Sequence, residues 1–143
     1  MIHLPIHTLL RRSFHAQRAK IGPCIAAEGL SPGQPKILRY LASHDGCLQK
    51  ELAASCDIEP ATVSKVLTGM EEAGLIRRKG SEQDKRAITV LLTEKGKAAD
   101  ARMQRHFAEL DGQELAGFTD QEIEAFSGYL ARVYRNLTGK ELE

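Results

Sequence analysis

The sequence predicts a mainly α-helical fold with one small β-hairpin. Three observations lead to this prediction: apolar residues recur at helical spacing towards both ends, two short helical segments lie in the middle, and a short alternating stretch follows a glycine-containing turn. At 143 residues, the chain is long enough for one domain with a single hydrophobic core. We therefore expect long helices on both sides of a central unit that contains the hairpin.

Two short helices are expected at the start of the central stretch, residues 49–96. Gln49–Ser55 has a helix-forming composition, with Leu52 and Ala53 facing inward. A four-residue turn separates this segment from Pro60. Proline suits the first position of a helix because the N–H that it lacks would have no partner there. The second helix is therefore expected to begin at Pro60.

This second helix has one apolar face and one polar face. Val63, Val66, Leu67 and Met70 recur at the spacing of a buried helical face. The opposite face carries small, hydroxylated or basic side chains, namely Ala61, Thr62, Ser64, Lys65 and Thr68. A helix in the major groove of DNA needs short side chains near its N-terminus for close approach, and donors for phosphates and base edges. The polar face supplies both.

A hairpin with a positively charged end follows. Gly74 is placed to end the helix in a left-handed conformation. Residues 75–79 predict a strand, 80–85 a hairpin tip, and Arg86–Leu92 a returning strand in which alternate residues are apolar. The hairpin carries Arg77, Arg78, Lys79, Lys85 and Arg86 against Glu82 and Asp84. Two short helices followed by a basic hairpin are typical of a winged helix-turn-helix, a fold that reads DNA.

The order and spacing of these motifs resemble one family. Residues 84–96, DKRAITVLLTEKG, resemble the Asp-x-Arg wing, apolar strand and Leu-Thr-x-x-Gly of the MarR family of transcription regulators. Residues 60–65, PATVSK, and 74–78, GLIRR, resemble its recognition helix and first wing strand. The resemblance is close over residues 30–103 and looser in the flanking helices. It implies a homodimer that binds double-stranded DNA, most often as a repressor.

The predicted DNA contacts lie on the second helix and the wing. The resemblance implies that Arg86 reaches the minor groove or its phosphates, and that Asp84 orients the wing by pairing with a nearby arginine. Lys85 and either Arg77 or Arg78 are expected to contact the DNA backbone, which adds affinity but no sequence information. The full predicted DNA-binding set is Ala61, Thr62, Ser64, Lys65, Thr68, Arg77, Arg78, Lys85 and Arg86.

Two helices are predicted before the central stretch. Residues 1–27 carry an apolar stripe, and Pro23 is expected to kink or end that helix. The next helix is expected to start with Ser31 as its cap and Pro32 as its first residue, with Gln34 completing a capping box. The chain thus reaches the central stretch through a long helix and a short one.

Two further helices are predicted after the wing. Thr93 can cap a helix that runs to about Leu115, with a glycine, Gly96, in its first turn because something packs close there. Residues 119–122 form a capping box ahead of the last helix. The last helix has a regular apolar stripe made of Ile123, Phe126, Leu130, Val133, Tyr134 and Leu137.

The terminal helices expose more apolar surface than one subunit can cover, so a homodimer is predicted. We expect a single MarR-like domain over residues 1–143, with 1–28 and 93–143 as dimerisation helices and 30–92 as the DNA-binding lobe. Two recognition helices would then meet successive major grooves of a near-palindromic operator.

Charge and hydropathy fit a DNA-binding protein without a membrane segment. The net charge is only +1, but residues 1–23 contain arginine and lysine and no acid, whereas acids outnumber bases in 107–143. Such a distribution orients a chain on a polyanion. No stretch has the length of a membrane span or the pattern of a signal peptide, so a cytoplasmic location is expected.

The sequence favours neither an enzyme nor a metal centre. No serine lies in a glycine-framed elbow, and no phosphate-cradling glycine loop occurs, so neither catalysis nor a cofactor is expected. His3 and His7 are one helical turn apart, but no acidic or thiolate residue lies near them in the sequence.

Two alternatives to a ligand-controlled DNA-binding regulator stay open. One is a winged-helix module that binds protein instead of duplex DNA. The other is a thiol-based redox sensor of the same fold, using Cys24, Cys47 or Cys56. The three cysteines are scattered and odd in number, so they predict no disulfide framework.

The resemblance also implies control by a small ligand. In this family a small aromatic or phenolic effector commonly enters between the DNA-reading lobe and the dimerisation helices and relieves repression. The residues expected at that pocket are Phe14, Arg18, Ile37, Tyr40 and His44. A ligand bound there would change DNA affinity only by binding two spacings of the lobes unequally.

Overall fold

The architecture follows the predicted order of elements, with one additional strand. The structure is a computed structural model in which residues 1–84 and 86–142 are described. Within these residues the elements are α1 (Ile6–Ala27), α2 (Gln34–Ser43), β1 (Cys47–Leu48), α3 (Gln49–Ser55), α4 (Pro60–Glu72), β2 (Ile76–Gly80), β3 (Ile88–Leu92), α5 (Glu94–Glu114) and α6 (Asp120–Thr138). The prediction of a mainly α-helical fold with a small hairpin is confirmed.

The chain forms two compact units, Met1–Ala108 and Glu109–Glu143. The first holds the sheet, the helices α1 to α4 and most of α5, and the second holds the end of α5 and all of α6. The boundary therefore falls within α5. The assignment of 1–28 and 93–143 to dimerisation, with 30–92 as the DNA-binding lobe, stays a prediction.

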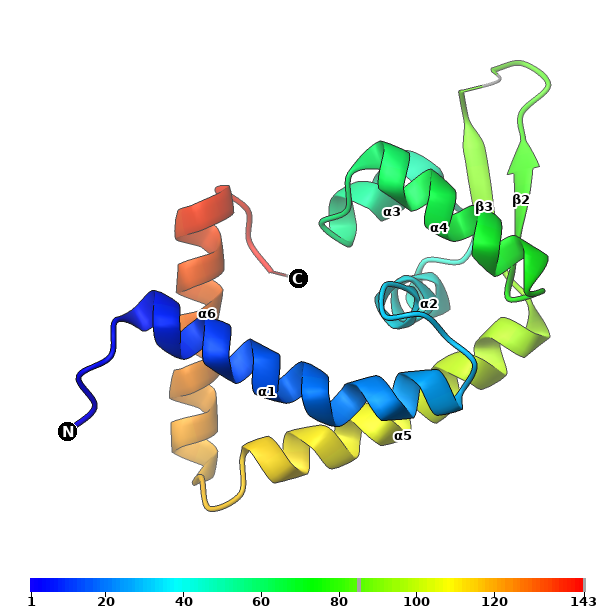
Figure 1. The fold of residues 1–143 in the computed structure, drawn as a ribbon. Helices are drawn as coiled ribbons and strands as arrows, with labels where there is room; N and C mark the ends of the chain where they lie inside the picture. The colour runs from blue at the N-terminus through cyan, green and yellow to red at the C-terminus, as the bar shows by residue number, and fades with distance from the viewer. Residues whose placement is uncertain (85, 143) are drawn as a thin grey trace. The chain divides into compact units, whose positions relative to one another are not determined.

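The sheet of the first unit has three antiparallel strands in the order β1-β3-β2. The β2–β3 hairpin is the predicted wing, paired from Ile76 with Leu92 to Gly80 with Ile88. Its tip projects beyond the helices of this unit (Figure 1). Strand β1 pairs Cys47 with Val90, and two residues are too few to show the alternation by which a strand is recognised.

The core of the first unit is formed by apolar residues of α2, α3, α4, α5 and the sheet. Its fully buried side chains include Ile37, Leu38 and Leu41 of α2, Leu52 of α3, Val63, Leu67 and Met70 of α4, Ile76 and Val90 of the sheet, and Met103 of α5. Each such side chain contributes roughly 1.5–3 kcal/mol through removal of apolar area from water. Val66 was expected in this core but is only half-buried.

Helix α4 ends as the sequence predicts. Gly74 has φ 76°, the left-handed conformation that costs glycine nothing. The N–H of Leu75 donates to the carbonyl of Met70 at 2.9 Å, and that of Gly74 to Glu71 at 3.0 Å. These two bonds form a Schellman motif, which turns the chain directly from α4 into β2.

The wing joins α5 at a tight junction around Thr93. The Thr93 hydroxyl lies 2.6 Å from the carbonyl oxygen of Gly74 and 2.9 Å from that of Leu75, and it accepts the N–H of Gly96 at 3.0 Å. A Cβ at Gly96 would lie 2.2 Å from the Leu75 oxygen and 2.7 Å from Leu92 Cδ1. The close packing expected at this glycine is therefore confirmed.

Both N-terminal helices differ from their predicted limits. Helix α1 begins at Ile6, not at Met1, and continues through Pro23 to Ala27. Pro23 was expected to kink or end this helix, and it does not end it, because Ile21 and Ile25, one turn apart, are both buried and hold the helix across the proline.

The predicted start of α2 at Pro32 is also wrong, since the helix begins at Gln34 with Gly33 as its N-cap. A helix starting at Pro32 would need residue 35 to donate to the Ser31 carbonyl, and Pro35 has no N–H. Gln34 donates to that carbonyl at 3.0 Å instead. One half of the predicted capping box survives, because the Ser31 N–H donates to Gln34 Oε1 at 3.1 Å.

The second unit contains the predicted capping box but little buried surface. Thr119 Oγ1 accepts the N–H of Glu122 at 3.2 Å, and Glu122 Oε2 accepts the N–H of Thr119 at 2.9 Å. The apolar stripe of α6 stays largely uncovered: no residue of this helix is buried, and Leu137 is 81% exposed. A soluble helix with such a stripe needs a partner surface.

Substitution of Gly96 by alanine tests the junction. We expect Gly96→Ala to lower the free energy of unfolding by about 1–3 kcal/mol, because the new methyl group overlaps a backbone oxygen. Gly112→Ala in the same helix is the matched control, since nothing lies within 4 Å of a Cβ there. The control should be neutral or up to about 1 kcal/mol more stable through helix propensity. Urea denaturation of both variants measures the difference, and equal effects would contradict the packing described.

Candidate nucleic-acid interface

The predicted polar face of α4 is accessible in the structure. Ala61, Thr62, Lys65 and Thr68 are exposed, and Ser64 is half-buried. The opposite face packs through Val63, Leu67 and Met70 into the core, so the helix cannot turn its polar side inward. The structure thus presents one continuous row of small, hydroxylated and basic side chains.

A left-handed residue sets the turn between α3 and α4. Asp57 has φ 54°, a conformation that aspartate adopts more readily than most residues. The N–H of Ile58 then donates to the carbonyl of Ala53 at 2.9 Å. This turn aims α4 away from α3, which is the arrangement of a helix-turn-helix.

Arg78 of β2 is bonded to α4. Its Nη2 donates to Thr68 Oγ1 at 2.9 Å and to Glu71 Oε1 at 3.3 Å, and its backbone N–H donates to Glu71 Oε2 at 2.9 Å. The backbone N–H of Arg78, with its guanidinium, lowers the pKa of Glu71 below its ordinary value of 4.5. Arg77, the residue before Arg78 in β2, is exposed.

The tip of the wing is organised by two side chains. Ser81 Oγ accepts the N–H groups of Gln83 and Asp84 at 3.2 and 3.3 Å. Asp84 Oδ1 accepts the backbone N–H of Arg86 at 2.9 Å. The pairing of Asp84 with a nearby arginine side chain, which the resemblance implies, stays a prediction. Arg86 is exposed, and Lys85 lies outside the described residues.

Sequence reasoning missed Glu71 in this region. An acid near the end of the predicted recognition helix looked like an ordinary surface residue. The available signal was spacing: Glu71 stands one helical turn after Thr68, so the two side chains share a face of α4. Arg78 lies on the strand that follows this helix. Only the pairing of α4 with β2 brings the three side chains together.

The residues predicted for a ligand pocket fall into two pairs and one core residue. The Arg18 guanidinium lies 5.7 Å from the centre of the Phe14 ring. Tyr40 and His44 stack with ring centres 4.1 Å apart and planes 5° apart. Ile37 is fully buried.

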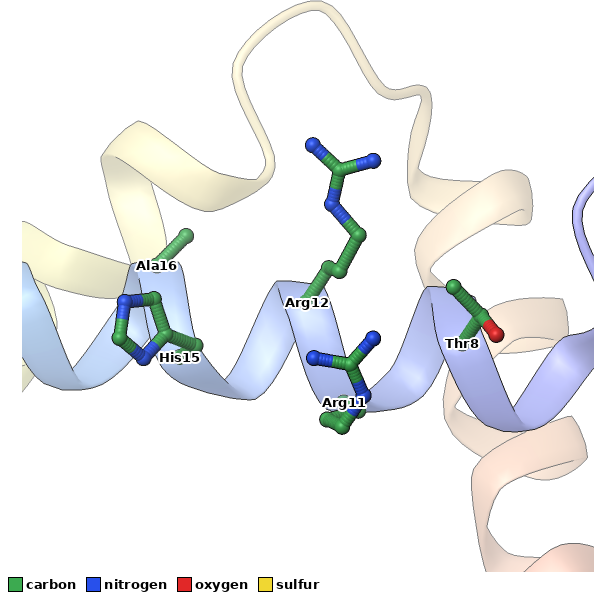
Figure 2. A pocket seen from close by; sticks show the side chains of 5 residues that line it. All are labelled: Thr8, Arg11, Arg12, His15 and Ala16. Atoms are coloured by element: carbon green, nitrogen blue, oxygen red, sulfur yellow. The ribbon is translucent and has the colours of Figure 1, made fainter.

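An open hollow lies along α1 instead. It measures about 510 Å³ and is lined by Thr8, Arg11, Arg12, His15 and Ala16, which Figure 2 shows along successive turns of the helix. The lining is rich in cationic donors, so it favours an anion over a neutral aromatic group. None of the five residues predicted for the ligand pocket lines it.

A cluster of polar side chains ties α1 to α5 within the first unit. Glu28 follows α1, and its Oε2 accepts from Arg102 Nε at 2.6 Å while its Oε1 lies 3.0 Å from His106 Nε2. These bonds, first that with His106 and then that with Arg102, lower the pKa of Glu28 below 4.5. The buried Asp100 adds a second tie, 3.4 Å from Arg39 of α2.

Two of the three cysteines, Cys47 and Cys56, are poorly placed for reactivity. Cys56 is buried and Cys47 is half-buried, and burial raises the pKa of both thiols above the ordinary value. Thiolate is the reactive form, so a raised pKa disfavours redox sensing at these two residues. Among residues 1–84 and 86–142, no three His, Cys, Asp or Glu side chains gather as metal ligands would.

No helix in the described part of the chain has both the length and the hydrophobicity needed to cross a bilayer.

Comparisons with known proteins agree with this geometry. Residues 28–87 match the model of the MarR family. The chain is 30% identical over 116 residues to the HTH-type transcriptional repressor YetL of Bacillus subtilis, covering 79% of this chain and 69% of YetL. It is 29% identical to a MarR-family transcriptional regulator from Silicibacter pomeroyi, whose crystal structure superposes with a TM-score of 0.79 over 93% of this chain and 90% of that one.

The fold also matches that of a protein whose crystal structure was determined in complex with DNA. MepR of S. aureus, in a MepR-DNA complex, superposes with a TM-score of 0.86 over 94% of this chain and 99% of MepR, at 23% identity. At this identity the likeness concerns the fold. The predicted winged helix-turn-helix is thereby confirmed.

The Glu28 cluster predicts a pH-dependent stability. Because folding lowers the pKa of this carboxylate below 4.5, the cluster stabilises the fold fully above that pH and loses its effect as pH falls through the folded-state pKa. We expect Glu28→Gln to lower stability at pH 6–7 and to match the wild type in strong acid. Urea denaturation across the pH range measures this. Glu109→Gln, an exposed acid on α5, is the control and should show no such convergence.

Proposed function

The chain belongs to the MarR family of transcription regulators. From this premise we propose that it is a homodimeric repressor that binds specific sequences of double-stranded DNA, and that a small-molecule ligand relieves the repression. Its relatives are regulators and not enzymes. The observation that carries the proposal is the pairing, within one unit, of an exposed polar helix face with a basic hairpin. A helix for the major groove and a wing for the neighbouring backbone are the two parts that such binding needs.

Base reading is proposed for the first half of α4. Thr62 and Lys65 are exposed donors, and Ala61 allows the helix backbone to approach the groove. Ser64 is half-buried, so its hydroxyl would contact the edge of the groove. The absence of acidic side chains from Pro60 to Met70 favours DNA over a basic protein surface as the partner of this face.

Phosphate contacts are proposed for the wing. Arg77 and Arg86 are exposed cations on the hairpin, and Lys85 stands beside Arg86 in the sequence. Asp84 supports this role by fixing the backbone at Arg86. Such contacts provide affinity for any duplex, whereas sequence preference comes from α4.

Dimerisation is proposed through the two ends of the chain. Ile6 and Phe14 of α1 are 66% and 58% exposed, and the apolar stripe of α6 is uncovered. A two-fold dimer buries the same surface of both subunits and pairs two recognition helices. The operator would then be near-palindromic, with half-sites about one helical turn apart.

Repression and its relief extend this proposal. The relative YetL is named a repressor. The effector would be a small aromatic or phenolic molecule near Phe14, Arg18, Ile37, Tyr40 and His44. It would act by preferring one spacing of the two DNA-reading units, and thus by changing the population of DNA-competent dimers.

Arginine 86 provides a test of the wing. We expect Arg86→Ala to weaken binding both to an operator duplex, obtained by selection from random DNA, and to a duplex of random sequence. The slope of the logarithm of the binding constant against the logarithm of salt concentration should become about one unit flatter. Fluorescence anisotropy over a series of salt concentrations measures both effects. Arg105→Ala removes an equal charge from an exposed position on α5 and should leave the slope unchanged. An unaltered slope in Arg86→Ala would refute the wing contact.

Selection of bound duplexes from random DNA tests the remaining claims. We expect a near-palindrome with half-site centres about one helical turn apart, because two recognition helices related by a two-fold axis impose that spacing. Sedimentation at micromolar concentration should show a dimer. A monomer in solution, or a selected site without internal symmetry, would contradict the proposed assembly.

A further inference from the structure

Arg78 differs from the other cations of the wing in where its guanidinium lies. Its side chain is 18% exposed, whereas Arg77, Lys79 and Arg86 are exposed. Its Nη2 sits between Thr68 Oγ1 and Glu71 Oε1, at 2.9 and 3.3 Å. A guanidinium held by two acceptors on α4 is turned towards the recognition helix and away from the phosphates that the wing would reach.

Glu71 gives both of its oxygens to the same residue. Oε1 accepts from the Arg78 guanidinium, and Oε2 accepts the Arg78 backbone N–H at 2.9 Å. The side chain and backbone of one strand residue are therefore fastened to one helical carboxylate. The arginine also neutralises an acid that would otherwise stand near the DNA-facing surface and repel phosphates.

The Thr68 hydroxyl is used within this cluster. It donates its hydrogen to the Ser64 carbonyl at 3.0 Å and accepts from Arg78 at 2.9 Å. A hydroxyl has one hydrogen, so Thr68 in this arrangement has no donor for an acceptor such as guanine O6 or N7 or thymine O4. Thr62 and Lys65, earlier on α4, stand outside the cluster and are exposed.

We propose that Arg78 is a positioning residue that locks the recognition helix to the first strand of the wing, and that Thr68 is its anchor and not a reader of bases. This inference rests on the proposed DNA-binding function and narrows its reading residues to the first half of α4. The lock fixes the distance between the helix and the wing before DNA arrives. Binding then avoids the cost of ordering these two elements relative to each other.

The conservative substitution Arg78→Lys tests the lock. Lysine keeps the charge but is a point donor that cannot hold Thr68 and Glu71 with one planar fork. We expect affinity for the selected duplex to fall about tenfold, affinity for random duplex to change little, and the salt slope to stay the same. Arg105→Lys, at an exposed position on α5, is the matched control and should alter none of these quantities.

Arg77→Ala gives the reference for a phosphate contact. It should weaken binding to both duplexes and flatten the salt slope by about one unit. If Arg78→Ala behaves in the same way on both duplexes, Arg78 is a phosphate contact and the lock is refuted. The lock is also refuted if Arg78→Lys binds the selected duplex as tightly as the wild type.

Thr68→Val separates anchoring from base reading. Valine has nearly the shape of threonine and removes the hydroxyl. We expect the variant to select the same DNA sequence as the wild type, with affinity lowered about as much as in Arg78→Lys. The double variant should be no weaker than Arg78→Lys alone, because Arg78→Lys already removes the Thr68–Arg78 bond that Thr68→Val removes. Relaxed preference at one base pair would instead show that Thr68 reads a base.

A measurement without DNA keeps this inference separate from the proposed function. A double-mutant cycle of Thr68→Val and Arg78→Lys on the free energy of unfolding should show coupling between the two residues. Additive effects would contradict the lock even if DNA binds. If the cycle shows coupling but the wild-type protein selects no duplex, the Thr68–Arg78 contact is supported and only the proposed function is contradicted.

Discussion

The junction of Leu75, Thr93 and Gly96 is the contact on which the rest of the first unit depends. At this point the end of α4, the start of β2, the end of β3 and the start of α5 meet within a few ångströms. The Thr93 hydroxyl serves the carbonyls of Gly74 and Leu75 and the first turn of α5, while the missing side chain of Gly96 leaves room for the Leu75 oxygen. Lys95 Nζ adds a bond to the Ala73 carbonyl at 2.7 Å.

This junction explains how a small polar surface can have a defined orientation. The wing and α4 are exposed elements, and exposed elements held only by their own hydrogen bonds move easily. Here each is fixed at its base by packing against the core and by the junction. Arg78 adds a second attachment farther along β2. Two attachments restrict the hinge motion that one would allow.

The same unit carries polar ties from the end of α1 and from α2 to the long helix α5. Glu28 joins the end of α1 to Arg102 and His106, and Asp100 joins α5 to Arg39 of α2. Asp100 is the buried member of this set, so loss of Arg39 would leave a buried carboxylate without its ion-pair partner, which is costly. These ties therefore hold the end of α1 and α2 to α5 within the first unit.

The sequence by itself determined the order of the elements and the polar face of α4. Periodicity, Pro60, Gly74 and the capping residues act through neighbours in the chain, so they can be read without a structure. Even the need for glycine at position 96 was legible, although its cause, the Leu75 oxygen, was not.

Tertiary structure decided what depends on contacts between distant residues. The two-residue β1 exists because β3 offers it a partner, and Pro23 stays helical because Ile21 and Ile25 are buried on both sides of it. Arg77 and Arg78 are adjacent basic residues, and from the sequence either could be the DNA-backbone contact. Only the placement of β2 beside α4 gives Arg78 the acceptors Thr68 and Glu71, because a strand directs neighbouring side chains to opposite faces.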